Sequence, residues 1–137
     1  MNKILQVKII IPTSILFDKE ALMVTIPGAA GELGILPGHT LLIVNLKEGL
    51  VKISIATNSK LTEEPTLEHL DKTNIQLLKF FVCTGIAEIT NKSVNIITEF
   101  AIDVTSLSLT ELPAKIELLK KMLEQGVEPS KISITNL

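Results

Sequence analysis

Two histidines and one cysteine are the residues of this 137-residue sequence best suited to metal binding or nucleophilic catalysis. His39, His69 and Cys83 make too small a ligand set for a structural zinc site, and the spacing supports no carboxylate that would complete it. A single histidine beside a Pro-Gly turn, as at His39, is more often a hydrogen-bonded structural residue than a catalytic base. Cys83 lies within an apolar strand pattern, which predicts a buried and unreactive thiol. The sequence therefore predicts no metal site, no bound cofactor and no catalytic residue.

The glycine-rich stretch 28–38 is the one place where a phosphate-binding loop could be sought. Such a loop needs four residues between its glycines, followed by Lys and then Ser or Thr. Gly34 and Gly38 have three residues between them, and His39 stands where Lys is required. Because the ammonium group that would meet the phosphates is absent, we reject a phosphate loop. Tight turns or bulges are expected over 28–38 instead.

Short strands must position these residues. Leu5, Val7 and Ile9 alternate with Gln6 and Lys8, a period of two that predicts a strand over residues 5–11. Further strands are expected at 21–26, 40–46, 50–56, 75–83, 86–90 and 94–98, with turns at 27–28, 47–49 and 91–92. Many short strands with turns at close intervals indicate an antiparallel sandwich or barrel.

Two segments depart from the strand pattern. Residues 57–74 are polar and charged, and they predict a long surface loop with a helical turn around 67–70. The second segment is the C-terminal tail, where an apolar stripe with helical spacing predicts an amphipathic helix. Its members are Leu112, Ile116, Leu119 and Leu123. We expect this helix to cover one edge of the sandwich, and a partner-binding helix is the alternative.

The ends of the tail helix carry their own signals. Thr110 is the expected N-cap, because it places Pro113 in the first turn, where the missing N–H costs little. Ser108 with Glu111 forms an alternative capping box. Gly126 is expected to end the helix, with Pro129 beyond it.

Bulk composition excludes several classes of protein. Hydrophobic residues make up 46% of the chain but aromatic residues only 3%, which predicts an aliphatic core in one domain with a small appendage. The formal charge of −2 gives no broad positive field for nucleic acid. No uninterrupted apolar run reaches the ~18 residues that a membrane-spanning helix needs. Any membrane association is therefore expected to go through another protein.

Residues 27–40 carry a resemblance to a known family. Pro27-Gly28, followed by the run from Gly31 to His39 (GELGILPGH), is similar to the central signature of the epsilon subunit of the F-type ATP synthase. Residues 49–53, 82–89 and 94–101 resemble further blocks of that family, in the same order and spacing. The resemblance covers the chain from residue 5 to about 104.

This resemblance implies a fold and a role. It implies a mainly β protein with a ten-stranded antiparallel β-sandwich of two five-stranded sheets over residues 1–104, followed by a short helical segment over 105–137. It further implies a non-catalytic rotor subunit of the central stalk at the cytoplasmic face of the bacterial plasma membrane, coupling proton flow to ATP synthesis. The implied partners are the gamma subunit, the ring of c subunits and, through the C-terminal segment, the catalytic alpha/beta hexamer.

The implied contact with the c ring lies in the loop that carries the Gly-Glu-Leu-Gly block. Glu32 is the main candidate because its carboxylate can pair with basic groups on the ring. Gly31 and Gly34 let the backbone approach closely, and His39 is expected nearby as a weaker candidate.

Departures from the family pattern qualify the implied regulation. Leu41 stands where the family usually has proline, and the C-terminal region offers one good helix where the family has two long ones. Asp103 is not followed by the Arg-Ala pair with which some members bind ATP. We therefore expect weak or absent self-inhibition and no ATP binding. Two other functions stay open at this stage: a β-sandwich module for a small ligand or carbohydrate, which the scarcity of aromatic residues disfavours, and a hydrolase using His39 with a carboxylate.

Overall fold

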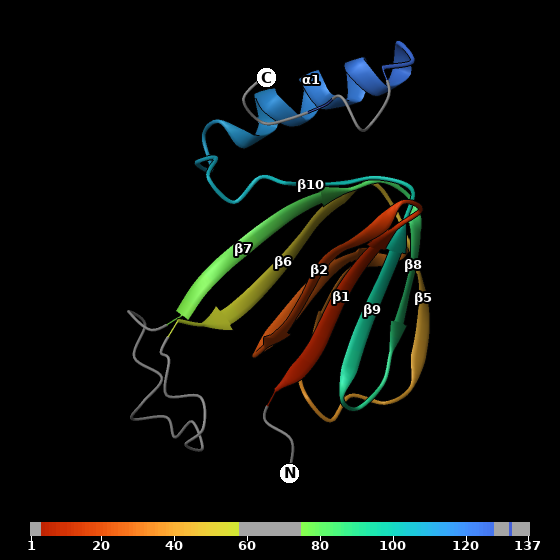
Figure 1. Cartoon of the computed structure of the whole chain (residues 1–137), viewed down its shortest axis with the longest axis vertical. Coiled ribbons are helices and arrows are strands. Elements are labelled where there is room, and N and C mark those ends of the chain that lie inside the picture. The colour runs from red at the N-terminus through yellow and green to blue at the C-terminus, as the bar shows by residue number, and fades with distance from the viewer. Residues whose placement is uncertain (1–3, 58–74, 128–131, 133–137) are drawn as a thin grey trace.

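The computed structural model describes residues 4–57, 75–127 and 132, and this part of the chain holds ten strands and one helix (Figure 1). The elements are β1 (Leu5–Ile11), β2 (Ser14–Ala21), β3 (Met23–Gly28), β4 (Gly31–Ile35), β5 (Leu42–Leu46), β6 (Gly49–Ala56), β7 (Ile75–Val82), β8 (Gly85–Ile89), β9 (Ser93–Thr98), β10 (Ala101–Asp103) and α1 (Leu112–Glu124).

The strands form two layers of five. One layer has the order β10-β7-β6-β3-β4 and the other β5-β8-β9-β1-β2, and the pairing of Gly28 with Leu46 joins them into one hydrogen-bonded sheet. The expected ten-stranded sandwich is confirmed, but its antiparallel character has one exception. β1 pairs with β9 in parallel, from Gln6 opposite Ser93 to Ile10 opposite Ile97. A parallel pair cannot be joined by a tight hairpin, so no local turn signal in the sequence announces it.

An aliphatic core fills the space between the layers. Leu5, Val7 and Ile9 alternate inward along β1 and are fully buried, as their period of two predicts. Phe17 and Phe80 are the two aromatic side chains in this core. The expectation of a mainly aliphatic interior is confirmed for the described residues.

A second apolar cluster lies on the outer face of the layer that contains β6, β7 and β10. Phe80 points between the layers, whereas its neighbour Phe81 points outward and is fully buried beneath α1 and the linker that precedes it. Figure 1 shows α1 lying across one end of the sandwich, next to β10. The buried members of the cluster are Phe81, Phe100, Ile102, Val104, Leu107, Leu112, Leu119 and Ile132. The predicted amphipathic helix that covers part of the sandwich is therefore confirmed.

The sequence pattern does not predict three of the observed strands, β2, β4 and β10, each for a physical reason. β2 has buried side chains only at Phe17 and Ala21, so it shows no period of two. β4 is glycine-rich and was expected as turns; it forms because it pairs with β3 along its whole length. β10 has only three residues. Pro27 and Gly28 end β3 and do not form the turn themselves. The predicted loop at 57–74 lies outside the described residues, apart from Thr57.

The helix begins one residue later than its capping signals suggested. Its N-cap is Glu111, without a side-chain capping bond, so the expectation of Thr110 is wrong. Ser108 organises the entry instead: its carbonyl oxygen accepts from Leu112 N at 3.0 Å, and its hydroxyl accepts from Glu111 N at 3.3 Å. Pro113 does lie in the first turn, and Gly126, with a φ of 82°, ends the helix as predicted.

Candidate partner-binding surfaces

Glu32 lies on a strand and not in a loop, which corrects the expectation for the Gly-Glu-Leu-Gly block. The block forms most of β4, and Glu32 stands opposite Pro27 in the antiparallel pairing with β3. Its side chain is exposed. Pairing along the whole of β4 holds the Cα of Glu32 in a fixed position at one end of the sandwich, so its carboxylate projects from a defined site.

The glycines of this hairpin have structural reasons of their own. Only Ala29 and Ala30 connect β3 to β4, and Gly31 has a φ of 137°, a backbone conformation that L side chains rarely adopt. A Cβ on Gly28 would lie 2.7 Å from the carbonyl oxygen of Gly31. Gly31 and Gly34 are both exposed, so they also leave the backbone of β4 open to a partner.

Charged groups of both signs surround Glu32. A hollow beside it is lined by Pro27, Glu32, Lys47, Glu48, Gly49, Leu50 and Lys52. Glu48 in turn forms an ion pair with Lys120 of α1, with 3.1 Å between Lys120 Nζ and Glu48 Oε1. Glu32 therefore lies at the same end of the sandwich as the C-terminal helix.

His39 lies at the opposite end of the sandwich from Glu32. β4 runs from Gly31 to Ile35 away from the helix end, His39 follows it, and β5 runs back from Leu42 to Leu46. The loop is tied to the turn between β8 and β9, because Gly38 N donates to Asn91 O at 2.9 Å. His39 is half-buried, and its Nδ1–H donates to its neighbour's carbonyl oxygen, Thr40 O, at 2.8 Å. The structure thus separates the two side chains that the sequence placed close together.

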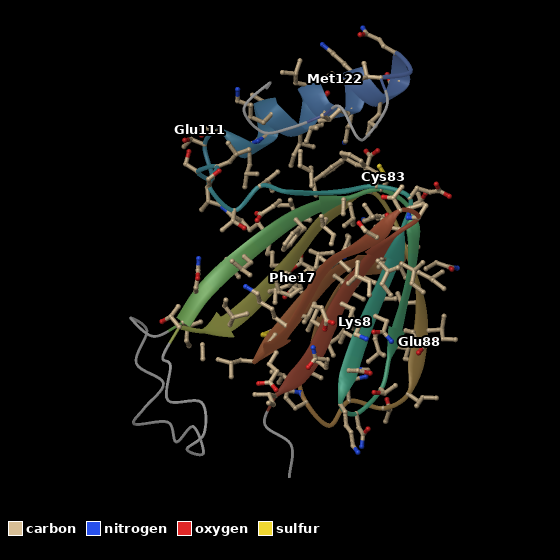
Figure 2. All side chains as sticks on the ribbon, in the orientation of Figure 1. Lys8, Phe17, Cys83, Glu88, Glu111 and Met122 are labelled. Carbon is tan, nitrogen blue, oxygen red and sulfur yellow. The ribbon has the colours of Figure 1, made fainter. Side chains whose placement is uncertain are left out.

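Cys83 follows the last residue of β7 and is half-buried at the edge of the outer cluster, below α1 (Figure 2). Burial raises the pKa of the Cys83 thiol above its ordinary value, and the nearby Glu48 carboxylate raises it further. A raised pKa keeps the thiol protonated and poorly nucleophilic at neutral pH. Among residues 4–57, 75–127 and 132, no three His, Cys, Asp or Glu side chains lie close enough together to hold a metal ion.

A row of four isoleucines, three of them exposed and Ile10 half-buried, crosses the outer face of the second layer, and sequence reasoning missed it. Ile86 pairs with Ile97, Ile97 with Ile10, and Ile10 with Ile15, so these four side chains occupy neighbouring positions on four adjacent strands. Ile86, Ile97 and Ile15 are 38%, 41% and 55% exposed. The available signal was the set of consecutive apolar residues in these strands, such as residues 9–11 and 96–97, which predicts apolar side chains on both faces.

Charged side chains border this isoleucine row. Lys8 and Glu88 both pair with Asn95. They therefore lie two residues along their strands from Ile10 and Ile86, on the same face of the sheet. Figure 2 shows them on the same layer, away from α1. A contiguous apolar row with a charged border is typical of a surface that docks another protein.

Among residues 4–57, 75–127 and 132, the structure contains no helix with the length and apolar character of a membrane span.

Comparisons with known proteins agree with this architecture. Residues 4–65 match the family model described as ATP synthase, Delta/Epsilon chain, beta-sandwich domain. The ATP synthase epsilon chain of Rickettsia typhi is 41% identical over 122 residues, which span 89% of this chain and 97% of the relative. The ATP synthase epsilon chain of Rickettsia felis is 40% identical over 126 residues, which span 91% and 99%.

Solved structures share the fold at much lower identity. A chain in the Euglena gracilis mitochondrial ATP synthase (OSCP/F1/c-ring) superposes with a TM-score of 0.61 at 15% identity, over 88% of this chain and 66% of that one. A chain in the Tetrahymena thermophila mitochondrial ATP synthase (central stalk/c-ring) gives a TM-score of 0.52 at 12% identity, over 93% and 98%. The identity over nearly the whole length of the Rickettsia proteins decides the assignment: this chain belongs to the ATP synthase epsilon chain family.

Proposed function

We propose that this chain is a non-catalytic rotor subunit that binds the gamma subunit and the c ring and so couples proton flow to ATP synthesis. The observation that carries the proposal is the identity of about 40% to ATP synthase epsilon chains over nearly their whole length. A rotor subunit transmits force through protein contacts and needs no substrate pocket. The proposed place of work is the cytoplasmic face of the bacterial plasma membrane, reached through the complex.

The isoleucine row supports a contact with the gamma subunit. Ile10, Ile15, Ile86 and Ile97 present apolar area on a sheet face outside the cluster beneath α1, and Ile10, Ile86 and Ile97 line a hollow there. Burial of apolar surface stabilises a subunit interface by about 25 cal/mol for each Å² removed from water. The flanking Lys8 and Glu88 would then set the orientation of the partner.

Glu32, which lies beside the turn of the β3–β4 hairpin, supports a contact with the c ring. Its exposed carboxylate can form charge-assisted hydrogen bonds with basic side chains of the ring loops. Gly31 and Gly34 have no side chains, so a partner can approach the backbone beside Glu32 closely. His39 lies at the opposite end of the sandwich, so it can take part only in a separate contact.

The C-terminal segment is proposed to face the catalytic alpha/beta hexamer and to regulate ATP hydrolysis weakly or not at all. It offers a single helix of 13 residues in the described part of the chain. The carboxylate of Asp103 already accepts a hydrogen bond from Thr105 N at 2.8 Å, so it stabilises its own linker. We propose that ATP does not bind here.

Copurification with a gamma–c-ring complex tests both contacts. We expect the wild-type chain to bind, Ile97→Asp to weaken gamma binding at least about tenfold, and Glu32→Lys to leave gamma binding intact while weakening the ring contact. Lys92→Glu, at the exposed turn between β8 and β9, is the matched charge control and should change neither. Binding of Ile97→Asp at wild-type strength would contradict the proposed gamma surface. Failure of the wild-type chain to copurify would contradict the proposal as a whole.

The proposed weak regulation has its own test. ATP hydrolysis by the catalytic complex is compared before and after the full chain is added, with copurification verifying that the chain assembles. We expect similar rates. A several-fold fall in the hydrolysis rate on addition of the chain would contradict the proposed weak or absent regulation.

A further inference from the structure

We propose that residues 104–127 and Ile132, here named the C-terminal lid, are locked onto the sandwich and unfold only together with it. The lid and the sandwich would then form one cooperative unit, whereas the sequence pattern suggests a sandwich with a separate appendage. This inference concerns the chain by itself and does not depend on the proposed function.

Apolar burial is the first support. Phe81 of the sandwich and Leu119 of α1 belong to one cluster, and both have 0% of their surface exposed. Phe100 and Ile102 lie in the same cluster and are almost completely buried. If the lid detached, two phenylalanines would be exposed on the outer face of the sheet together with the apolar stripe of the helix. Exposure of that much apolar surface is strongly unfavourable.

The linker to α1 is the second support, because it is tied to Lys79 of β7 at three points. Val104 N donates to Lys79 O at 2.8 Å, which continues the pairing of β10 with β7. Lys79 N donates to Thr105 Oγ1 at 2.9 Å. The ammonium group of Lys79 donates to Leu107 O at 2.8 Å. These bonds hold the backbone of the linker against the sheet before the helix begins.

Chain composition gives the linker no obvious hinge. Residues 101–112 contain neither glycine nor proline, and no residue of this stretch has a positive φ. Hinges are commonly loop residues that can absorb large changes in φ and ψ. This linker lacks glycine, and its backbone is already held to β7 by hydrogen bonds.

The ion pair between Lys120 of α1 and Glu48 of the sandwich contributes only a minor part. Lys120 and Glu48 are 37% and 41% exposed, and an exposed pair contributes little to stability. The lid is therefore held mainly by apolar packing, and moderate salt should not release it.

Native-state hydrogen exchange of the full chain tests the lock. Amide exchange is followed by NMR or mass spectrometry for residues 116–123 of α1 and for the core strands β1 and β6. If the lid is locked, the most protected α1 amides should show protection within about tenfold of the strand amides and lose it over the same range of urea. A lid that exchanges more than about a hundredfold faster than the strands, with little dependence on urea, would overturn the proposal.

Two neighbouring leucines provide matched variants. Leu119→Ala removes a fully buried side chain, and Leu118→Ala removes one that is 40% exposed on the same helix. In a single cooperative unit, Leu119→Ala lowers the protection of the α1 amides and of the β1 and β6 amides together. Leu118→Ala should leave both unchanged. Loss of protection confined to α1 in the Leu119→Ala variant would show that the lid opens independently and would also overturn the proposal.

Discussion

The rings of Phe17 and Phe80 meet edge to face, with 5.3 Å between their centroids and 65° between their planes. Phe17 lies on β2 and Phe80 on β7, two strands from opposite layers that no described hydrogen bond of the sheet joins. The aromatic contact therefore closes the side of the sandwich that the backbone ladder leaves open. Edge-to-face pairs contribute beyond their buried area, because the positive ring edge meets the negative ring face.

Truncation of this contact should destabilise the fold strongly. Phe17→Ala is expected to lower the free energy of unfolding by about 3–5 kcal/mol, because it removes a buried ring and leaves a cavity between the layers. Urea unfolding followed by circular dichroism measures the change. Ile15→Ala on the same strand is the control: its side chain is 55% exposed, and it should cost less than about 1 kcal/mol. Equal losses of stability for the two variants would contradict this role of the Phe17–Phe80 contact.

Gly85 should tolerate no side chain. A Cβ at this position would clash with the carbonyl oxygen of Ile97 and would lie 3.0 Å from the Cα of Thr98, both in the backbone of β9. Since the paired backbone cannot move away, Gly85→Ala should cost about 1–3 kcal/mol or more in the free energy of unfolding.

Gly34→Ala is the matched control for that glycine. Its Cβ would meet only the terminal methyl group of Met23, at 2.9 Å, and a flexible methionine can move. We expect a much smaller loss of stability from thermal or urea unfolding. A loss as large as that of Gly85→Ala would show that strand conformation, and not the clash, determines the cost.

Alkaline pH should reveal the environment of Cys83. Its thiol has a pKa above the ordinary value of 9.0 in the folded chain, so the unfolded chain releases this proton first as the pH rises. The stability linked to the protonated thiol is fully present below about pH 9 and is lost as the pH rises through the folded-state pKa. The difference in unfolding free energy between wild type and Cys83→Ala should therefore be constant from about pH 6 to 8 and change as the pH rises above about 9. Parallel stability curves over the whole range would contradict the raised pKa.

Removal of the ion pair across the helix interface should matter little. Lys120→Ala is expected to lower the free energy of unfolding by less than about 1 kcal/mol, since both charges are exposed. The loss should shrink further in 1 M salt, where screening is nearly complete. Lys121→Ala, on the exposed side of the same helix, is the comparison. A loss above about 2 kcal/mol for Lys120→Ala alone would assign the ion pair a larger part in holding α1.

Local pattern was sufficient to predict some elements and not others. The alternation of Leu5, Val7 and Ile9 predicts β1 correctly, because one face of that strand is buried and the other is not. The apolar stripe of the tail predicts α1 for the equivalent reason. β4 could not be found in this way, because its strand conformation comes from pairing with β3 and its glycines have low strand propensity.

The candidate contacts were only partly predictable, since their positions depend on how the strands are arranged in space. Glu32 and His39 are seven residues apart in the sequence, yet Glu32 lies near the start of β4 and His39 beyond its end, so they lie at opposite ends of the sandwich. The row through Ile97 requires the parallel pairing of β1 with β9, which no local signal reveals. Chain topology, and not residue type, determines both results.

Proton-driven ATP synthesis tests the proposed role most directly. An ATP synthase that lacks only its epsilon subunit is reconstituted into lipid vesicles, and ATP synthesis under an imposed proton gradient is measured before and after this chain is added. The proposed role predicts that the chain binds the complex and restores synthesis, and that Ile97→Asp does so much less well. A chain that leaves synthesis unchanged and remains unbound would contradict it.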